Sequence, residues 1–497
     1  MNPFQITTPS GRSQILWTLT GILFSGICWY AAFDLSFHAW WALWLAPIPV
    51  LYLSLQTKGL RAFGIAFLAF LIGRLSWFSY LHSVLPLPPV LIFTIFFPLA
   101  FGLVIIATRS MAKIAPPAVA ILVYPVLWTA FEYLQFLFSR DGTIASIAYT
   151  QSDFLPIVQI ASVTGVLGIT FLVCFVPSVI TFSFYYHQQG KKVRHLILPA
   201  GIVMIAVLTF GWIRLYTAPP PGNILIGQAA ISRKSYGNDY DPRSAIQLSL
   251  AQLHLQEVRS LADSGAKVII LPEKGIPVSD SSEPVIKTQF QEAARNAKAT
   301  IIVGVTRLYK DHPECQAWVF SPEGQLLLNY RKVNLFEGEV MDGFVPGKDP
   351  GYFNLDGNIS GVAICKDLDY ERYSSRYRRL GASILYVPAW DFGRDGWLHS
   401  RIAMMRAVEN GYTLVRNAQQ GRLTISDDRG RVTAEANCEN GKGAFLTGTT
   451  GPSAGPSLYS RWGNWFGWLD LIVAAYFLVW RIIRRLLVPV RTLQYNH

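Results

Sequence analysis

Cys365 is the residue of this sequence with the clearest potential for chemistry. It follows a short apolar run, residues 359–364, and precedes two charged residues, Lys366 and Asp367. A thiol attacks as its thiolate, and because its ordinary pKa is about 8.5, it requires a base or a nearby cation at neutral pH. A cysteine at the end of a buried strand is more often a packing residue. The prediction that Cys365 is a catalytic nucleophile therefore depends on partner residues from elsewhere in the chain.

Two charged residues occupy the same kind of position as Cys365. Glu273 stands in Ile-Ile-Leu-Pro-Glu-Lys after one apolar run, and Lys332 stands in Asn-Tyr-Arg-Lys-Val-Asn after another. Open α/β sheets place their ligands at the carboxyl ends of strands. Either charge alone would be a solvated loop residue in most proteins. Together with Cys365 they bring a carboxylate, an ammonium group and a thiol to strand ends.

An α/β pattern that can position these residues begins where Pro219, Pro220, Pro221 and Gly222 break a helix, and it continues to about Gly451. Strands are predicted at 223–228, 267–271, 300–305, 315–320, 325–331, 359–364 and 382–387, and around Leu414, Leu423 and Ala444. Helices are predicted at 247–264, 283–297, 370–380 and 398–410. At roughly 230 residues, this segment forms one compact domain with an ample core.

The chain as a whole has the composition of a membrane protein. Of its 497 residues 51% are hydrophobic and only 15% are charged, and the mean hydropathy is +0.31. Eight apolar runs approach the length of about 20 residues that a spanning helix requires. They lie at 14–33, 39–55, 60–81, 90–108, 118–138, 158–186, 196–215 and 468–487. The rival interpretation of the first run is a cleaved signal peptide, but no small-residue cleavage site precedes Asp34.

Basic residues in short loops predict the orientation of these spans. They follow the second, fourth and sixth spans and the last one: Lys58, Arg61, Arg109, Lys113, Lys191, Lys192, Arg194, and Arg481, Arg484, Arg485 and Arg491. The positive-inside rule then places the N-terminus and the tail in the cytoplasm and the α/β domain outside. The predicted domains are a seven-helix bundle at 1–218, a catalytic domain at 219–455, and a last helix with a basic tail at 456–497.

The order Glu273, Lys332, Cys365 resembles the nitrilase superfamily, whose catalytic set has these three side chains on an α-β-β-α sandwich. The helical motif Arg406-Ala-Val-Glu-Asn-Gly is similar as well. Seven preceding spans and one trailing span resemble the apolipoprotein N-acyltransferase family within it, as does Arg416-Asn-Ala-Gln-Gln-Gly. The resemblance covers nearly the whole chain, and it implies a membrane helical bundle joined to an extracytoplasmic nitrilase-like domain in a bacterial inner membrane.

The resemblance also implies roles for the site residues. Glu273 would be the base, because burial raises the pKa of a carboxyl group toward neutral pH. Lys332 and the backbone N–H of Lys366 would stabilise the thiolate and the oxyanion. Glu339 resembles the second glutamate of the family, which orients the lysine, and Glu337 is the alternative. The acyltransferase pattern has Tyr-Glu after the cysteine, where this chain has Lys366 and Asp367.

By the same resemblance, the enzyme would move an acyl chain from a phospholipid to the N-terminal amine of a lipoprotein through a Cys365 thioester. It would act as a monomer without cofactor or metal. Trp390 and Trp397 are candidate acyl-chain contacts, although core packing is the commoner role. One alternative is a membrane-tethered amidase with the same three residues. Another is a transporter or receptor with an inactive nitrilase-like binding module.

Four further features of the sequence favour structural roles or argue against nucleic-acid and zinc binding. The net charge of +12 is spread over loops, which argues against a nucleic-acid-binding face. No cysteine or histidine cluster has zinc spacing, although a disulfide between Cys315 and Cys438 is conceivable. Arg74 and Glu132 lie in or near spans and are expected to snorkel to the interface. The tryptophans before the last span, Trp462, Trp465 and Trp468, are expected to form an interfacial belt.

Overall fold

The computed structural model describes residues 11–220, 222–232 and 243–487, and contacts divide them into two compact units. The helical unit holds the residues up to Leu137, then Leu167–Ala206, and those from Asn464 onward. The α/β unit holds Phe138–Val166 and Val207–Gly463. The division follows contacts instead of chain order, and the predicted domain bounds of 1–218, 219–455 and 456–497 stay a prediction.

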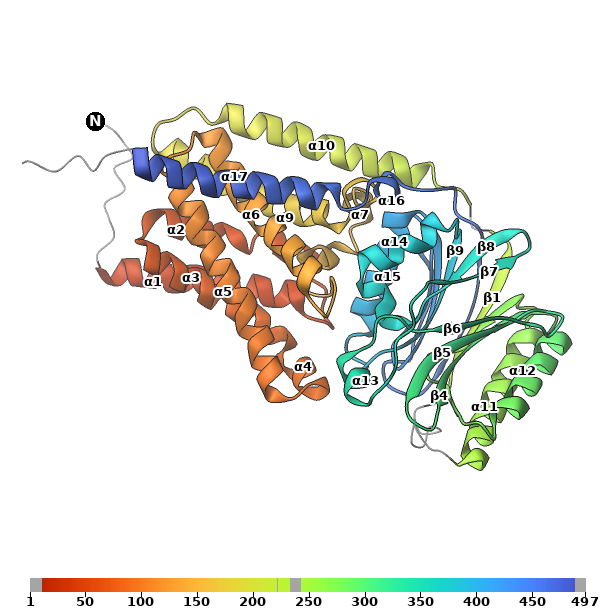
Figure 1. Ribbon diagram of the computed structural model, residues 1–497. Helices are drawn as coiled ribbons and strands as arrows, with labels where there is room; N and C mark the ends of the chain where they lie inside the picture. The colour runs from red at the N-terminus through yellow and green to blue at the C-terminus, as the bar shows by residue number, and fades with distance from the viewer. Residues whose placement is uncertain (1–10, 221, 233–242, 488–497) are drawn as a thin grey trace, which may run out of the picture. The chain divides into compact units, whose positions relative to one another are not determined.

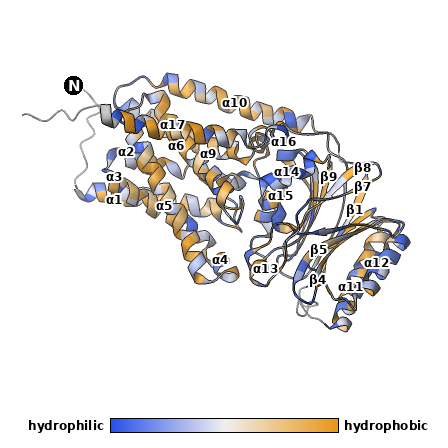
Figure 2. Cartoon of the chain, in the orientation of Figure 1, coloured by the Kyte–Doolittle hydropathy of each residue, from blue (hydrophilic) through white to orange (hydrophobic). Residues whose placement is uncertain are grey.

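Seven described helices are long and apolar enough to cross a membrane, and Figure 2 shows that orange, hydrophobic residues recur along them. They are α1 Gly11–Phe33, α3 Gly59–Arg74 with its extension α4 Phe78–Val84, α5 Leu87–Ala112, α6 Pro117–Phe138, α9 Val166–Gln188, α10 Arg194–Tyr216 and α17 Trp465–Leu487. Mutually buried aromatic rings pack α1, α3, α5 and α6 together, for example Phe70 against Phe101 at 4.8 Å. The predicted combination of a membrane helical bundle with an α/β domain is confirmed.

The predicted second span, 39–55, is not one helix. It consists of η1 Trp40–Trp44 and the ten-residue helix α2 Pro47–Gln56, because Pro47 has no N–H and opens a new helix. The contacts of α1 with α2 show that the two run antiparallel, since Ser25 contacts the carbonyl of Ala46 and Gly21 lies against Leu53. The two short helices together therefore return the chain along α1.

The basic loops gather at one end of the helical unit. Nε of Arg109, in the last turn of α5, donates to the carbonyls of Ser54 and Thr57 at 2.9 and 2.7 Å. Tyr52 near the end of α2 donates to Gln188 at the end of α9 at 3.0 Å. The loops that follow α2, α5 and α9 thus share one end, as a common side of a bilayer would require.

The two charged residues singled out in the spans do not snorkel. Arg74 is only 2% exposed, and its guanidinium lies 4.7 to 5.4 Å from four ring centroids, those of Phe33, Trp77, Phe93 and Phe97. Glu132 is equally buried and accepts hydrogen bonds from Trp128 and Thr170 at 3.1 and 2.7 Å. The snorkelling prediction was wrong because aromatic faces and polar donors inside the unit satisfy both charges.

The α/β unit contains two sheets (Figure 1). The first has the order β13-β1-β2-β4-β5-β6, with β3 also paired to β4. Its strands are β1 Ile224–Ala230, β2 Val268–Ile270, β3 Ile276–Val278, β4 Thr300–Leu308, β5 Pro313–Phe320, β6 Leu326–Arg331 and β13 Ala444–Thr450. The second has the order β12-β11-β10-β9-β8-β7. Its strands are β7 Gly351–Leu355, β8 Asn358–Val362, β9 Ile384–Trp390, β10 Thr413–Gln419, β11 Arg422–Ser426 and β12 Val432–Asn437.

The sheets pack face to face and helices cover their outer faces, so the unit is an α-β-β-α sandwich, as predicted. Side chains of both sheets, such as Val319 and Tyr386, share the inner core. The helices α11 Ser244–Asp263 and α12 Glu283–Ala297 cover the first sheet (Figure 1). The helices α14 Glu371–Arg379 and α15 Gly396–Asn410 cover the second. The short elements β3, β7, β12, α13 Glu337–Met341 and η5 Cys365–Asp369 were not predicted.

Residues of the α6–α9 connection belong to the α/β unit, which the sequence did not predict. They form η3 Ile147–Gln151, α7 Leu155–Val158 and α8 Ala161–Thr164, and Gly165 with φ of 70° ends α8 before α9 begins. Gln159 donates to the carbonyl of Arg429 at 2.8 Å, and the N–H of Val166 donates to Glu409 at 2.9 Å. The predicted span at 158–186 therefore begins only at Val166.

Candidate active site

The structure brings Glu273, Lys332 and Glu339 into direct contact. Nζ of Lys332 lies 2.7 Å from Oε1 of Glu273 and 2.9 Å from Oε2 of Glu339. All three residues are at most 3% exposed. Lys332 follows β6, Glu273 follows β2, and Glu339 lies on α13, where its carboxylate also accepts the N–H of Phe336 at 2.8 Å. A buried ammonium group therefore bridges two buried carboxylates.

Lys274 is a second cation in this cluster, and sequence reasoning missed it. Its Nζ lies 2.6 Å from Oε1 of Glu339 and 5.0 Å from the ring centroid of Phe344. Burial alone would raise the pKa of Glu339, but Lys332 and Lys274 lower it to about 2. Burial opposes the charge of Lys332, yet Glu273 and Glu339 hold its pKa well above the ordinary value. Glu339 and both lysines thus stay charged at neutral pH.

Cys365 opens η5 with a φ of 43°, a left-handed conformation that costs a residue other than glycine on the order of 1 kcal/mol. Its Sγ lies 3.4 Å from the carbonyl oxygen of Trp390, to which it donates. Burial raises the pKa of the thiol well above its ordinary value, Glu273 raises it further, and Lys332 acts in the opposite direction. The resting group is therefore a thiol, and its reaction requires transfer of the proton to a base.

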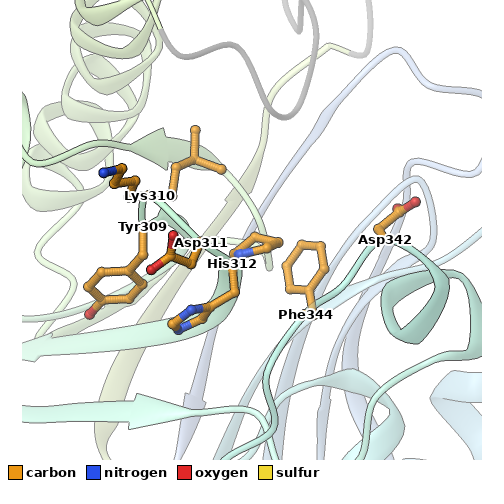
Figure 3. Close-up of a pocket in the computed structure, with 8 residues that line it drawn as sticks. Tyr309, Lys310, Asp311, His312, Asp342 and Phe344 are labelled. Atoms are coloured by element: carbon orange, nitrogen blue, oxygen red, sulfur yellow. The ribbon is translucent and has the colours of Figure 1, made fainter.

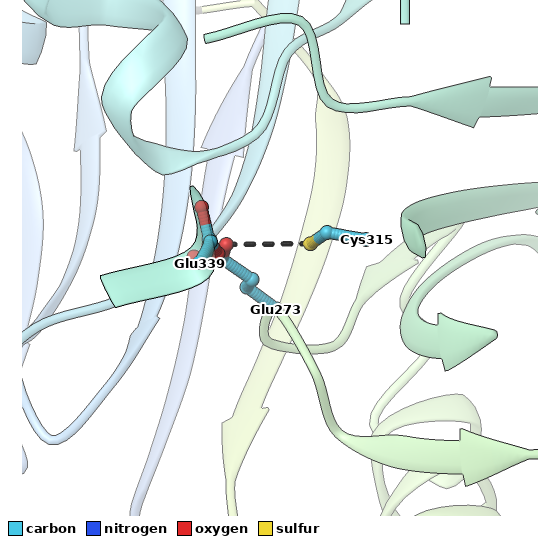
Figure 4. A group of neighbouring side chains, drawn as sticks. All are labelled: Glu273, Cys315 and Glu339. Carbon is cyan, nitrogen blue, oxygen red and sulfur yellow. Dashed lines mark hydrogen bonds between the residues drawn. The ribbon is translucent and has the colours of Figure 1, made fainter. Parts of the chain in front are cut away.

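Cys315 is a further thiol in the site. Its S–H donates to Oε1 of Glu273 at 3.4 Å, and its carbonyl accepts the N–H of Lys332 at 2.9 Å (Figure 4). Burial and then Glu273 raise its pKa well above the ordinary value, so it remains a donor. Cys438 donates instead to the carbonyl of Ala418 at 3.0 Å. Both cysteines are free thiols in the structure, so it contains no disulfide between Cys315 and Cys438.

Asp367 joins the segment that follows Lys332 to the turn that bears Cys365. Its Oδ1 accepts the backbone N–H groups of Val333 and Asn334 at 3.3 and 2.8 Å. Its Oδ2 accepts the N–H of Ile364 at 2.9 Å and the hydroxyl of Tyr330 at 2.6 Å. The residues next to Lys332 and next to Cys365 are thus bound to one carboxylate, and Asp367 positions both.

Comparison with known proteins places both parts of the chain in one family. A family model described as carbon-nitrogen hydrolase matches residues 237–448, and one described as apolipoprotein N-acyltransferase N-terminal domain matches residues 25–179. The two matches, together with the curated relatives, support an apolipoprotein N-acyltransferase within the nitrilase superfamily. The family's two domains thus occur in this chain in the order that the sequence predicted, and the protein is an acyltransferase.

Curated relatives of this acyltransferase match it over most of their length. The apolipoprotein N-acyltransferase of Geobacter metallireducens is 26% identical over 71% of this chain and 72% of its own. That of Thermotoga maritima is 22% identical over 87% of this chain and 88% of its own. The 2-oxoglutaramate amidase of Bacillus subtilis is 28% identical over 35% of this chain and 76% of its own. A crystal structure of an amidase from Nesterenkonia sp. is 18% identical, with a TM-score of 0.41 over 48% of this chain and 93% of that one.

A buried ion pair on the second sheet lies next to the residue whose carbonyl accepts the Cys365 thiol. Both guanidinium Nη atoms of Arg416 on β10 donate to the carboxylate of Asp391, at 2.6 and 2.8 Å. Asp391 directly follows Trp390, whose carbonyl accepts the Cys365 thiol. A side chain on Gly421 would meet Oδ2 of Asp391 at 1.9 Å, so only glycine fits there. The pair fixes the strand end that contacts Cys365.

Three predicted site residues have other surroundings. Glu337 has a side chain that is 46% exposed and lies 4.0 Å from Arg140, so Glu339 is the glutamate that contacts Lys332. Trp397 is only 6% exposed, and the guanidinium of Arg401 lies 5.7 Å from its ring. Trp390 is half-buried at the end of β9. Roles of Trp390 and Trp397 in acyl-chain binding stay predictions.

Two further features of this acyltransferase bear on ligands. The donor atoms of Glu273, Cys315 and Glu339 lie within 4.8 Å of one another, a spacing that could hold a metal ion. The ammonium group of Lys332 already contacts both carboxylates, so these residues fit a lysine better than a metal. A hollow of about 390 Å³ is lined by residues 308–313 with Asp342 and Phe344 (Figure 3), and none of the three candidate catalytic residues Glu273, Lys332 and Cys365 lines it.

Proposed function

We propose that this protein transfers an acyl chain from a membrane phospholipid to the N-terminal amine of a diacylglyceryl-cysteine lipoprotein. The observation that supports this most is the buried contact of Lys332 with Glu273 and Glu339 in the same unit as Cys365. The family's N-terminal domain in the same chain favours lipid substrates over soluble amides. The protein would act as a monomer, with no nucleic-acid partner.

In the first half-reaction, Sγ of Cys365 attacks the ester carbonyl carbon of the phospholipid while Glu273 accepts the thiol proton. The S–C bond forms, and the oxyanion of the tetrahedral intermediate faces Lys332 and the backbone N–H of Lys366. When the intermediate collapses, the C–O ester bond breaks and the leaving alkoxide takes the proton from Glu273. A lysophospholipid leaves, and the acyl chain remains on Cys365 as a thioester.

In the second half-reaction, the amine of the acceptor attacks the thioester carbon. Glu273 accepts a proton from the attacking nitrogen, the C–S bond breaks, and Cys365 recovers its proton. An amide is released without any oxidant or reductant. Because the lysophospholipid leaves before the amine reacts with the thioester, the kinetics follow a ping-pong scheme. Burial and Glu273 raise the pKa of Cys365 and Lys332 acts in the opposite direction, so Lys332 is the group that favours the leaving thiolate.

The location that we propose is a bacterial inner membrane with the α/β unit on its periplasmic side. The three basic loops share one end of the helical unit. The positive-inside rule assigns that end to the cytoplasm. The helix α10 starts from this end at Arg194 and is long enough to cross a bilayer. The chain that follows α10 would therefore lie outside.

The test is the intact mass of the full-length protein in detergent micelles after incubation with a phospholipid of defined acyl chains. We expect an added acyl mass that is absent in Cys365→Ala and that disappears when a diacylglyceryl-cysteine peptide is supplied. An unchanged wild-type mass would overturn the proposal. Loss of the acyl mass in water, with ammonia release from small amides, would favour the amidase alternative instead.

A further inference from the structure

We propose that residues 139–146, the start of the connection between α6 and α9, are a positioning element of the active site that holds the turn bearing Cys365. We call this segment the connecting loop. The connecting loop lies between two membrane-spanning helices in the sequence, whereas the other residues of the site lie between 273 and 416. The proposal concerns the reactivity of the Cys365 thiol toward any electrophile, so it does not depend on the proposed acyl donor or acceptor.

The first contact joins Thr143 to the end of the turn. Both the backbone N–H and the hydroxyl of Thr143 donate to the carbonyl oxygen of Asp369, each at 2.9 Å. Asp369 is the last residue of η5, whose first residue is Cys365. The final carbonyls of a helical turn have no partner within it and require an outside donor. The connecting loop supplies two donors to this one oxygen.

Gly142 makes the close approach possible. A side chain at this position would meet the carbonyl oxygen of Asp369 at 2.3 Å and its carbon at 2.7 Å. The φ of Gly142 is 56°, a conformation that other residues adopt only with strain. The loop and the turn are therefore in contact through their backbones, and two separate constraints require glycine at this residue.

The second contact joins Asp141 to the residue after the nucleophile. Nζ of Lys366 lies 2.9 Å from Oδ1 of Asp141, and the Lys366 side chain is only 8% exposed. The hydroxyl of Tyr370, just past the turn, donates to the carbonyl of Arg140. The backbone N–H of Lys366 is the group assigned to the oxyanion. The connecting loop thus contacts the turn at Lys366 and Asp369, and contacts Tyr370 directly after it.

The connecting loop is itself fixed to the core of the α/β unit. The hydroxyls of Thr143 and Tyr149 lie 2.6 Å apart, and the guanidinium of Arg406 donates to both. Arg406 lies on α15 and is paired with Glu409, and both side chains are fully buried. The helix α15 packs on the second sheet. The connecting loop is therefore fixed to that sheet through Arg406, and it holds the turn Cys365–Asp369 in place relative to it.

The experiment measures the second-order rate at which iodoacetamide alkylates Cys365 in the full-length protein in micelles, read by intact mass. Cys365→Ala gives the background from the other four cysteines, which are all buried. We expect Asp141→Asn to slow alkylation threefold to tenfold and Gly142→Ala to slow it more than tenfold. Arg140→Ala is the matched control and should react within twofold of wild type, because its side chain is 87% exposed and the loop uses only its carbonyl.

A charge exchange keeps the proposal testable if Gly142→Ala does not fold. Lys366→Asp alone should slow alkylation, and the double variant Asp141→Lys with Lys366→Asp should recover to within threefold of wild type. With an acyl substrate, Asp141→Asn should lower kcat while KM and the thermal unfolding temperature stay at their wild-type values, which separates a positioning effect from a loss of folded protein. Wild-type alkylation rates in Asp141→Asn and Gly142→Ala, or an equal loss in Arg140→Ala, would overturn the proposal.

Discussion

The thiol of Cys315 lies 3.4 Å from Oε1 of Glu273, the same oxygen that lies 2.7 Å from Nζ of Lys332. Two donors therefore hold this oxygen of the base. We expect Cys315→Ala to slow thioester formation about threefold to tenfold, since a typical hydrogen bond contributes about 0.5–1.5 kcal/mol. Cys315→Ser retains a donor and should lose less. Single-turnover acylation measures this, and equal wild-type rates in both variants would exclude a role for Cys315.

Glu339 has a larger expected effect, because it is the shared partner of Lys332 and Lys274. Glu339→Gln leaves two buried ammonium groups with less compensation, and breaking a buried pair costs about 3–5 kcal/mol. We expect thioester formation to fall at least about a hundredfold by the same energetics. Acylation rates measure the loss of thioester formation, and thermal unfolding measures the loss of stability. Glu337→Gln, at a half-exposed position on the same helix, is the control, and an equal loss there would refute the assignment of Glu339 as the partner of Lys332.

The pair of Asp391 with Arg416 predicts a loss of stability that chemically conservative changes do not avoid. Arg416→Lys cannot form both hydrogen bonds with the Asp391 carboxylate, and Asp391→Asn leaves the buried guanidinium without a counter-charge. We expect each variant to lower the free energy of unfolding by about 3 kcal/mol or more. Denaturant unfolding monitored by tryptophan fluorescence measures this. Losses that add fully in the double variant would show that the two residues are not coupled.

His399 predicts how stability changes at alkaline pH. Its two ring nitrogens lie 3.6 Å from Asp369 and 3.3 Å from Asp395. Burial lowers its pKa, but the two carboxylates raise it to about 10. The stabilisation is therefore fully present below the unfolded pKa of about 6.5 and is lost as the pH rises through about 10. We expect unfolding curves of wild type and His399→Gln to converge across this window, and a constant difference would contradict the shift.

Much of the α/β unit could be predicted because local patterns specify it. Glu283–Ala297 forms the predicted helix with the predicted bounds, since Pro284 and the apolar spacing mark it locally. Glu273, Lys332 and Cys365 could be found because strand ends are visible in the sequence. The choice between Glu337 and Glu339 could not be made, because both lie on one short helix and only packing against Lys332 separates them.

The residues that the sequence did not reveal depend on contacts between distant segments. The sequence left a disulfide between Cys315 and Cys438 conceivable, and only the register of β5 with β6 places Cys315 beside Lys332 and Glu273. Lys274 follows Glu273 with a φ of 53°, and no local pattern predicts that its side chain reaches Glu339. The predicted span 39–55 was expected to be one helix. Only Pro47 gave a signal in the sequence that the helix is interrupted.

The hydrogen bond of Thr143 to Asp369 joins residues 226 positions apart. At a synthesis rate of about 5–20 residues per second, Thr143 leaves the ribosome roughly 10 to 45 s before Asp369 does. The connecting loop must therefore remain available, between two inserted helices, while most of its own domain is still being made. The cysteine can acquire its full reactivity only when these two stretches meet, so activation of the thiol is a late event in the biogenesis of the protein.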